Sequence, residues 1–193
     1  MARRSDHTRD ELKELAIAAG CALIVEKGFA QFSARGVAGR IGYTVGTLYN
    51  VFGSLDEFIL CLNARTLDAW YDYLCAAIDG AKSGQLLKLA MAYINFAQQH
   101  VNLWSALFLH QSEQEVPDWY KAKTRRFFDL VESVLAGQSN EDEKTIRIQA
   151  KTLWAGIHGI CVLSLGNQLA QVDAGSAETL ARHLIEALVV EKD

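Results

Sequence analysis

Four polar side chains close together in the sequence have the chemistry to bind a nucleic acid. Thr44, Thr47, Tyr49 and Asn50 carry hydroxyl and amide groups that can hydrogen-bond phosphate oxygens and the edges of bases. Val51 and Phe52, which follow directly, are apolar, so they can anchor the same helix to a core. The polar set therefore belongs on the exposed side of a short helix.

The segment around these residues has the spacing of a helix-turn-helix. Ser33 can cap a short helix that reaches about Ile41, Gly42 breaks that helix, and Thr44 can cap the next. Helices this short are not stable alone, so they must pack against each other. Such a pair packs at a steep angle, and its second helix fits a major groove about 12 Å wide. Helix pairs with a glycine turn also occur in ordinary bundles, and a purely structural role is the alternative.

Other residues with reactive side chains show no pattern typical of catalysis or of metal binding. The four cysteines form no C-x-x-C pair, so we expect reduced, buried thiols. His110 and His158 have no second ligand three or four residues away and are more typical of hydrogen-bonded groups in a core or pocket. Serine, cysteine and carboxylate residues do not have the spacing of a nucleophilic site. We expect no metal, no cofactor and no enzymatic activity.

Helical periodicity extends over almost the whole chain of 193 residues, which contains a single proline. The capping box of Thr8 and Glu11 predicts a first helix that ends at Lys27, before Gly28. A second capping box, at Ser54, opens a long fourth helix. The helices predicted from there on span residues 54–78, 83–100, 101–112, 117–136, 142–169 and 176–191. Together with the two short helices, the prediction is an all-α fold of nine helices.

Local residues also predict where three of the later helices begin. Pro117 suits the first turn of its helix, where its missing N–H would have had no partner. Asn140 with Glu143 gives a further capping signal, and Ser176 follows Gly175 at the start of the last helix.

The formal net charge of −4 hides a difference between the two ends of the chain. Residues 1–52 contain seven basic and five acidic residues, a net charge of +2, whereas the rest of the chain carries −6. A polyanion is therefore attracted to one end. Arg3, Arg4 and Arg9 form a basic arm that can reach a neighbouring groove or phosphate, although an ordinary solvated terminus has the same composition.

The helices predicted after Gly80 hold most of the aromatic residues, at helical spacing. A chamber lined by aromatic rings and a few polar groups is the usual form of a small-molecule site. The alternative is a filled core made of the same rings. The residues predicted to line the site are Tyr93, Phe96, Trp104, Phe108, His110, Gln111, Trp119, Phe127, Trp154 and His158.

The last two predicted helices carry broad apolar faces that suit a subunit interface. Gly156 and Gly159 allow a neighbouring helix to approach closely. Paired with the same helices of a second copy, these faces would form a four-helix bundle. Two-fold symmetry would then present two recognition helices to a palindromic DNA site. The residues predicted at this interface are Leu153, Ile157, Ile160, Leu180, Leu184 and Leu188.

The sequence of residues 33–52, SARGVAGRIGYTVGTLYNVF, resembles the DNA-binding segment of the TetR family of transcriptional regulators. That segment runs through a Ser- or Thr-capped helix, a glycine turn and a Gly-Thr-Leu-Tyr recognition helix that ends in Phe. The resemblance is specific over roughly residues 10–65, where the run EKGF at 26–29 is similar to the end of the family's first helix. Later it rests on helix order and on the run WAGIHG at 154–159, which is similar to part of the penultimate helix of many members.

The resemblance implies DNA contacts for individual residues. Those residues are Arg35, Tyr43, Thr44, Thr47, Tyr49 and Asn50. Thr47 and Tyr49 would hold phosphates or bases, Arg35 and Thr44 would touch the DNA backbone at the groove edge, and the other two would lie within reach of bases.

Three residues depart from the family pattern. Gly36 stands where an acidic residue often completes the helix cap, and Val45 and Leu55 stand where lysines are common. Two phosphate charges are therefore missing. Since each lost phosphate contact flattens the slope of log affinity against log salt by about 0.9, we expect a shallow salt dependence.

The resemblance implies a ligand-responsive DNA-binding regulator, most often a repressor that a small, largely apolar or aromatic effector releases from a palindromic operator. Residues 1–52 would form the DNA-binding domain and residues 53–193 the ligand-sensing and dimerisation domain, with the fourth helix as the connection. We expect a cytoplasmic homodimer, with the uncharged stretches 89–112 and 152–172 as buried helices rather than membrane spans. The alternative is a helical-bundle enzyme or carrier for an apolar molecule that has no DNA role.

Overall fold

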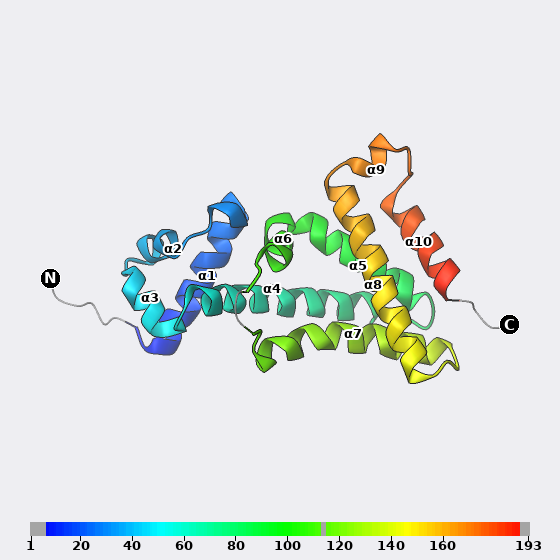
Figure 1. The fold of residues 1–193 in the computed structure, drawn as a ribbon, viewed down its shortest axis with the longest axis horizontal. Helices are drawn as coiled ribbons and strands as arrows, with labels where there is room; N and C mark the ends of the chain where they lie inside the picture. Colours follow the sequence, from blue (N-terminus) through cyan, green and yellow to red (C-terminus); the bar gives the residue numbers. More distant parts are fainter. Residues whose placement is uncertain (1–6, 113–114, 190–193) are drawn as a thin grey trace. The chain divides into compact units, whose positions relative to one another are not determined.

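The computed structural model describes residues 7–112 and 115–189, and every regular element within them is helical (Figure 1). The elements are α1 Arg9–Lys27, the 3₁₀ helix η1 Phe29–Gln31, α2 Ala34–Ile41, α3 Val45–Phe52, α4 Leu55–Ile78, α5 Gln85–Gln99, α6 Val101–Leu109, α7 Asp118–Gln138, α8 Glu143–Leu165, α9 Gln168–Gln171 and α10 Ala177–Leu188. The all-α prediction is confirmed. The nine expected helices are present among the described residues, which also contain the single turns η1 and α9.

Local capping explains why the first helix begins and ends as predicted. The Glu11 N–H donates to Thr8 Oγ1, and the Thr8 N–H donates to Glu11 Oε2 at 2.7 Å, which completes the predicted capping box. These two bonds satisfy backbone donors that a helix start leaves without partners. At the other end α1 stops at Lys27.

The later helices follow the predicted order, but several starts and ends differ; α6, for example, stops at Leu109 rather than at 112. Asp142, not Asn140, caps α8, because its carboxylate accepts the Thr145 N–H at 3.0 Å. Pro117 lies one residue before α7 rather than in its first turn. The predicted helix 142–169 is interrupted after Leu165, since Asn167 has a φ of 57° and the short α9 follows.

The described contacts divide the chain into two compact units. The first unit comprises residues 1–66 and 102–116, and the second comprises 67–101 and 117–193. The helix α4 contributes residues to both units, and most of α6 belongs to the first. These units are defined by packing, and the functional domain boundary at residue 52 stays a prediction.

The first unit has its own apolar core, formed mainly by α1, α2, α3 and the beginning of α4. In Figure 1 the first three of these helices lie together. Val37 of α2 and Leu48 of α3 are almost completely buried in this core, and so is Phe58 of α4. Their burial positions the two short helices, which would not be stable alone.

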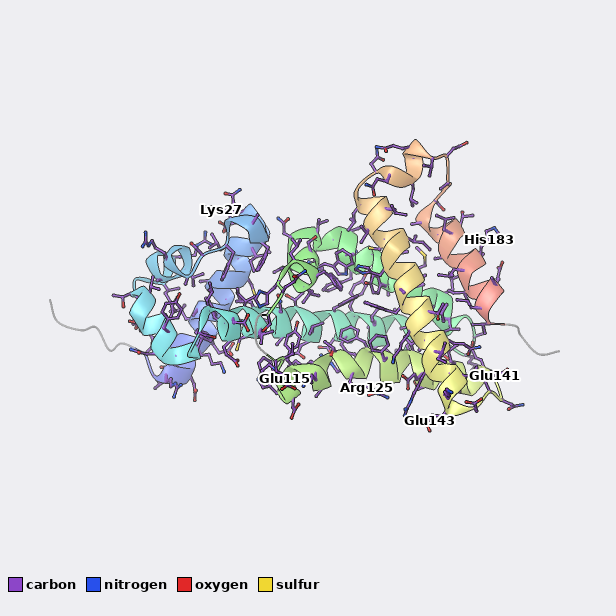
Figure 2. The ribbon with its side chains drawn as sticks, viewed as in Figure 1. Lys27, Glu115, Arg125, Glu141, Glu143 and His183 are labelled. Carbon is purple, nitrogen blue, oxygen red and sulfur yellow. The ribbon has the colours of Figure 1, made fainter. Side chains whose placement is uncertain are left out.

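The second unit packs α5, α7, α8 and α10 against one another. Its buried residues include Leu89, Ile94, Leu135 and Cys161. Burial raises the pKa of the Cys161 thiol to about 11, so this cysteine stays protonated. Figure 2 shows the side chains of this unit and labels His183, which lies on the exposed side of α10.

Candidate nucleic-acid interface and aromatic core

The predicted helix-turn-helix is present, and side-chain caps define both of its helices. Ser33 Oγ accepts the Gly36 N–H at 3.1 Å at the start of α2. Gly42 then takes a left-handed conformation, with φ 75° and ψ 24°, which a residue with a Cβ rarely adopts. Thr44 Oγ1 accepts the Thr47 N–H at 3.2 Å at the start of α3. The turn between the helices is therefore short and well defined.

The side chains of α3 separate into a buried face and an exposed face. Leu48 and Phe52 anchor the helix in the core of the first unit. Tyr49 is 42 % exposed, and Thr44 and Asn50 are also exposed. Three of the predicted DNA-binding residues are thus exposed, Thr44 at the N-cap of α3 and Tyr49 and Asn50 within the helix.

Thr47 has a more local role than the other three. It is half-buried, and its hydroxyl lies 2.9 Å from Thr44 Oγ1, so the two threonines bond each other at the first turn of α3. The Thr47 hydroxyl can still accept a second bond.

Two of the remaining predicted DNA contacts lie on α2 and in the turn before α3. Arg35 is exposed on α2, and Tyr43 is half-buried in the turn before Thr44. Arg3 and Arg4 lie outside the described residues. Arg9 belongs to α1 rather than to an arm, and its guanidinium donates to the Val51 carbonyl at 3.1 Å.

Two side-chain contacts in this part of the first unit were not predicted from the sequence. His7 Nδ1 lies 2.8 Å from the Tyr43 hydroxyl, although the residues are 36 positions apart. Arg40 donates to both carboxylate oxygens of Glu26, at 2.9 and 2.6 Å, and this pairing lowers the pKa of Glu26. No local signal in the sequence indicates either contact.

The end of α6 is tied to the beginning of α4 within the first unit. His110 Nε2 lies 2.7 Å from Asp56 Oδ1, and the Ser112 hydroxyl donates to Asp56 Oδ2 at 2.7 Å. The ring of Phe29 meets the His110 ring edge-on at 6.1 Å. Near the start of α6, the Asn102 amide donates to the Val25 carbonyl of α1 at 2.9 Å.

Four of the predicted ligand-binding residues therefore belong to the first unit. Trp104 is buried and its ring lies 4.9 Å from that of Phe108, which is partly exposed. His110 bonds Asp56 as described, and Gln111 is exposed. These residues are not among the aromatic residues that gather in the second unit.

The second unit contains an aromatic cluster centred on Trp70 of α4. The Trp70 ring lies 4.7 Å from Tyr93, 5.8 Å from Phe96 and 4.9 Å from Phe127. Trp70 is 3 % exposed, and its indole N–H has no hydrogen-bond partner among the described residues. Trp70 was not predicted at the ligand site because it precedes Gly80, and the predicted lining residues come from the helices after Gly80.

A hydrogen bond joins this cluster to α8. The Tyr93 hydroxyl lies 2.7 Å from His158 Nδ1, and the Trp154 ring stacks on His158 at 5.6 Å. Burial lowers the pKa of His158, which favours the neutral imidazole. Five predicted ligand-binding residues, Tyr93, Phe96, Phe127, Trp154 and His158, are thus connected through ring contacts and this bond.

Trp119 is not part of these contacts. The second unit also has a groove, which is lined by other residues than the predicted ones. Trp119 is 41 % exposed at the start of α7 and contacts Tyr120. A groove of about 520 Å³ lies between α7 and α8, and none of the predicted ligand-binding residues lines it. Its charged residues include Arg125, which Figure 2 labels, and Lys151.

The predicted dimerisation residues have different degrees of burial within a single chain. Leu153 and Ile157 are each 5 % exposed, so they pack in the core of the second unit. Ile160, Leu180, Leu184 and Leu188 are half-buried. The exposed apolar residues of α8 are Ile148, Trp154, Val162 and Leu163.

The described residues contain no group of three histidine, cysteine or acidic side chains placed to hold a metal ion. No single described helix has both the length and the apolar character to cross a membrane. The bent pair Val45–Phe52 and Leu55–Ile78 meets the length and composition criteria together, with 72° between its helices.

Comparison with known proteins supports the helix-turn-helix assignment and extends it to the rest of the chain. Residues 16–60 match the family model of the bacterial regulatory proteins of the tetR family, and residues 86–188 match the tetracyclin repressor-like C-terminal domain. A search among curated proteins finds no match.

Solved structures with this fold cover nearly the whole chain. A TetR-like transcriptional regulator from Rhodococcus sp. RHA1 is 17 % identical, with a TM-score of 0.65 and coverage of 94 % of this chain and 96 % of that chain. BioQ, solved with its natural double-stranded DNA operator, is 15 % identical, with a TM-score of 0.63 and coverage of 92 % and 97 %. The multidrug binding protein EbrR, complexed with imidazole, is 18 % identical, with a TM-score of 0.66 and coverage of 98 % and 97 %. Because the two family models match both the helix-turn-helix and more than half of the chain beyond it, this protein belongs to the TetR family of transcriptional regulators.

Proposed function

We propose that this regulator binds a palindromic operator as a homodimer, represses transcription there, and leaves the DNA when a small, largely apolar or aromatic effector binds. The observation that carries the DNA-binding part is the exposed face of α3. Tyr49 and Asn50 of α3 and its N-cap Thr44 are exposed, while Leu48 and Phe52 hold the other side of the helix in the core. A capped helix with polar groups on its outer face suits direct contact with base edges.

The apolar exposed face of α8 supports the homodimer. Ile148, Val162 and Leu163 are 56 %, 44 % and 42 % exposed, which leaves a row of large apolar side chains in contact with water. Gly159 lies on the same helix, and a Cβ built there would meet no atom within 4 Å. A second copy would bury these side chains, and the small residue would let its helix approach closely. Because Leu153 and Ile157 are buried within a single chain, the proposed interface consists of the exposed residues Ile148, Val162 and Leu163 instead.

The aromatic cluster around Trp70 supports an effector of apolar or aromatic character. Its rings present apolar surface, whereas the buried Trp70 N–H and the Tyr93–His158 pair are its polar groups. A ligand that contacts these rings and accepts a bond from the Trp70 N–H would satisfy a buried donor. EbrR, which has the same fold, binds imidazole in its structure. An effector that binds about 1.4 kcal/mol more tightly to a conformation that does not fit DNA than to the DNA-binding conformation would weaken operator binding about tenfold.

Fluorescence anisotropy with a labelled duplex from the region upstream of the protein's own coding sequence tests DNA binding. Asn50→Ala and Tyr49→Ala are expected to weaken binding by about tenfold or more, because each removes a contact worth about 1–3 kcal/mol. Asn95→Ala is the matched control, since Asn95 is an exposed amide within α5. Wild-type affinity in both α3 variants would contradict the proposal.

A thermal-shift screen of apolar and aromatic metabolites tests the effector. A ligand specific to the folded protein raises its melting temperature, and it should also lower duplex affinity in the anisotropy assay. Trp70→Phe keeps most of the ring surface but removes the N–H donor, so it is expected to weaken the response to a ligand that carries an acceptor. A full response in that variant would contradict a role for the donor.

A further inference from the structure

The DNA-facing surface, defined here by Arg35, Thr44, Tyr49 and Asn50, has few fixed positive charges. Within the described part of α2 and α3, Arg40 is already bound to Glu26, with its Nη2 2.6 Å from Glu26 Oε2. Val45 and Leu55 are apolar. Since phosphate contacts supply much of the affinity for DNA, a further cation beside this surface would have a large relative effect.

His7 contacts Tyr43, the residue that precedes this surface in the turn between α2 and α3. Its Nδ1 lies 2.8 Å from the Tyr43 hydroxyl, and the two ring centres are 6.0 Å apart. Tyr43 directly precedes the Thr44 cap, and its backbone N–H donates to the Ala38 carbonyl at 2.9 Å. The main chain of Tyr43 is therefore held at the start of α3, and His7 is placed there with it.

We propose that His7 is a proton-dependent phosphate contact of the DNA-facing surface and that it makes operator binding stronger at acidic pH. This inference rests on the proposed DNA-binding function. In the neutral tautomer that carries its proton on Nε2, the Tyr43 hydroxyl donates to Nδ1, and its proton is not available to DNA. When the imidazole is protonated, Nδ1–H donates to the Tyr43 oxygen instead. Protonation thus adds one positive charge and leaves both the Tyr43 O–H and His7 Nε2–H to donate to phosphate.

Charged side chains of both signs follow His7 in the first turn of α1. The first turn of α1 contains Arg9, Asp10 and Glu11, and the turn between α2 and α3 contributes Tyr43. Bonds from the Thr8 N–H and hydroxyl lower the pKa of Glu11, so Glu11 remains an anion over the pH range of interest. Its charge attracts a protonated His7 but repels phosphate, and protonation of His7 offsets that repulsion. Histidine is the side chain whose charge ordinarily changes between about pH 5 and 8.

The test measures duplex affinity of the full-length protein at about pH 6 and pH 8, each over a series of salt concentrations. We expect the wild type to bind about threefold more tightly at the lower pH, as for an exposed ion pair. The slope of log affinity against log salt should also be steeper there, by about 0.9 for each His7 that contacts a phosphate. His7→Ala should remove both differences, and His7→Lys should bind tightly with the steeper slope at both pH values.

Two control variants separate His7 from other ionisable groups. His183→Ala removes an exposed histidine of α10 and should keep the wild-type pH dependence. Tyr43→Phe removes the hydroxyl but keeps the ring, so it should lose part of the pH dependence and keep the change in salt slope.

The outcomes distinguish this inference from the proposed function. A wild type that binds no duplex at either pH overturns the proposed function and the inference with it. A wild type that binds duplex, together with a His7→Ala variant that keeps the full pH dependence or a His7→Lys variant that stays pH dependent, overturns the role of His7 alone.

Discussion

The Tyr93 hydroxyl of α5 and His158 Nδ1 of α8 are 2.7 Å apart, and they form a polar pair beside buried aromatic rings. The two residues are 65 positions apart, and no local pattern in the sequence predicts their hydrogen bond. The bond joins two helices of the second unit at the edge of the His158 ring, while Trp154 stacks on a face of that ring.

The buried His158 predicts a loss of stability at acidic pH. Its pKa is lowered by burial, whereas in the unfolded chain the imidazole has its ordinary value near 6.5. Below about pH 6.5 the imidazole takes up a proton more readily in the unfolded chain than in the folded protein, so the free energy of unfolding falls as the pH decreases. We expect His158→Gln to show a smaller fall between about pH 7.5 and 5.5 than the wild type, measured by urea denaturation. His183→Gln, at an exposed position, should behave like the wild type; an equal fall in all three proteins would contradict the assignment.

Gly156 of α8 packs directly against the side chain of Leu184 of α10. A Cβ built on Gly156 overlaps Leu184 Cδ2 and lies 3.3 Å from Cδ1, so Gly156→Ala must move that side chain. Overpacking costs about 1–3 kcal/mol, and the gain in helix propensity recovers up to about 1 kcal/mol. Gly137→Ala also gains helix propensity, but nothing lies within 4 Å of a Cβ there, so we expect Gly156→Ala to be less stable than Gly137→Ala by the overpacking cost of about 1–3 kcal/mol in urea denaturation. Equal stability of the two variants would show that Leu184 moves at no cost.

Replacing Leu55 with lysine at the start of α4 should strengthen DNA binding. Leu55 is 38 % exposed, so a lysine there loses little packing and gains a phosphate contact if the DNA-facing surface is correctly assigned. We expect Leu55→Lys to increase duplex affinity and to steepen the slope of log affinity against log salt by about 0.9 for each new contact. Leu109→Lys adds the same charge at a 62 % exposed position in α6 and serves as the control. Identical slopes for the two variants would argue against the assignment.

A charge in the exposed apolar face of α8 should separate the proposed homodimer. Val162→Glu would place a carboxylate in the interface without a partner, at a cost of about 3 kcal/mol or more, which weakens dimerisation at least about a hundredfold. Sedimentation velocity over a concentration series measures the effect. Val172→Glu, at a 73 % exposed position after α9, should leave the dimer intact. A dimer that tolerates Val162→Glu, or a wild type that is monomeric throughout, would contradict the interface.

The sequence by itself determined the helices and the exposed face of the recognition helix. Caps such as Thr8 with Glu11, and Thr44 with Thr47, act within three residues, so their hydrogen bonds can be predicted from local sequence. The same locality explains the error at α8, since Asn140 and Asp142 are both plausible caps and the carboxylate of Asp142 takes the Thr145 N–H.

Tertiary structure alone decided which residues from different helices meet. Apolar periodicity identifies the face of a helix that is buried, but not the helix that covers it, because any complementary apolar face satisfies the same pattern. For this reason the contact of His7 with Tyr43, the central place of Trp70 and the burial of Leu153 within a single chain were not predicted.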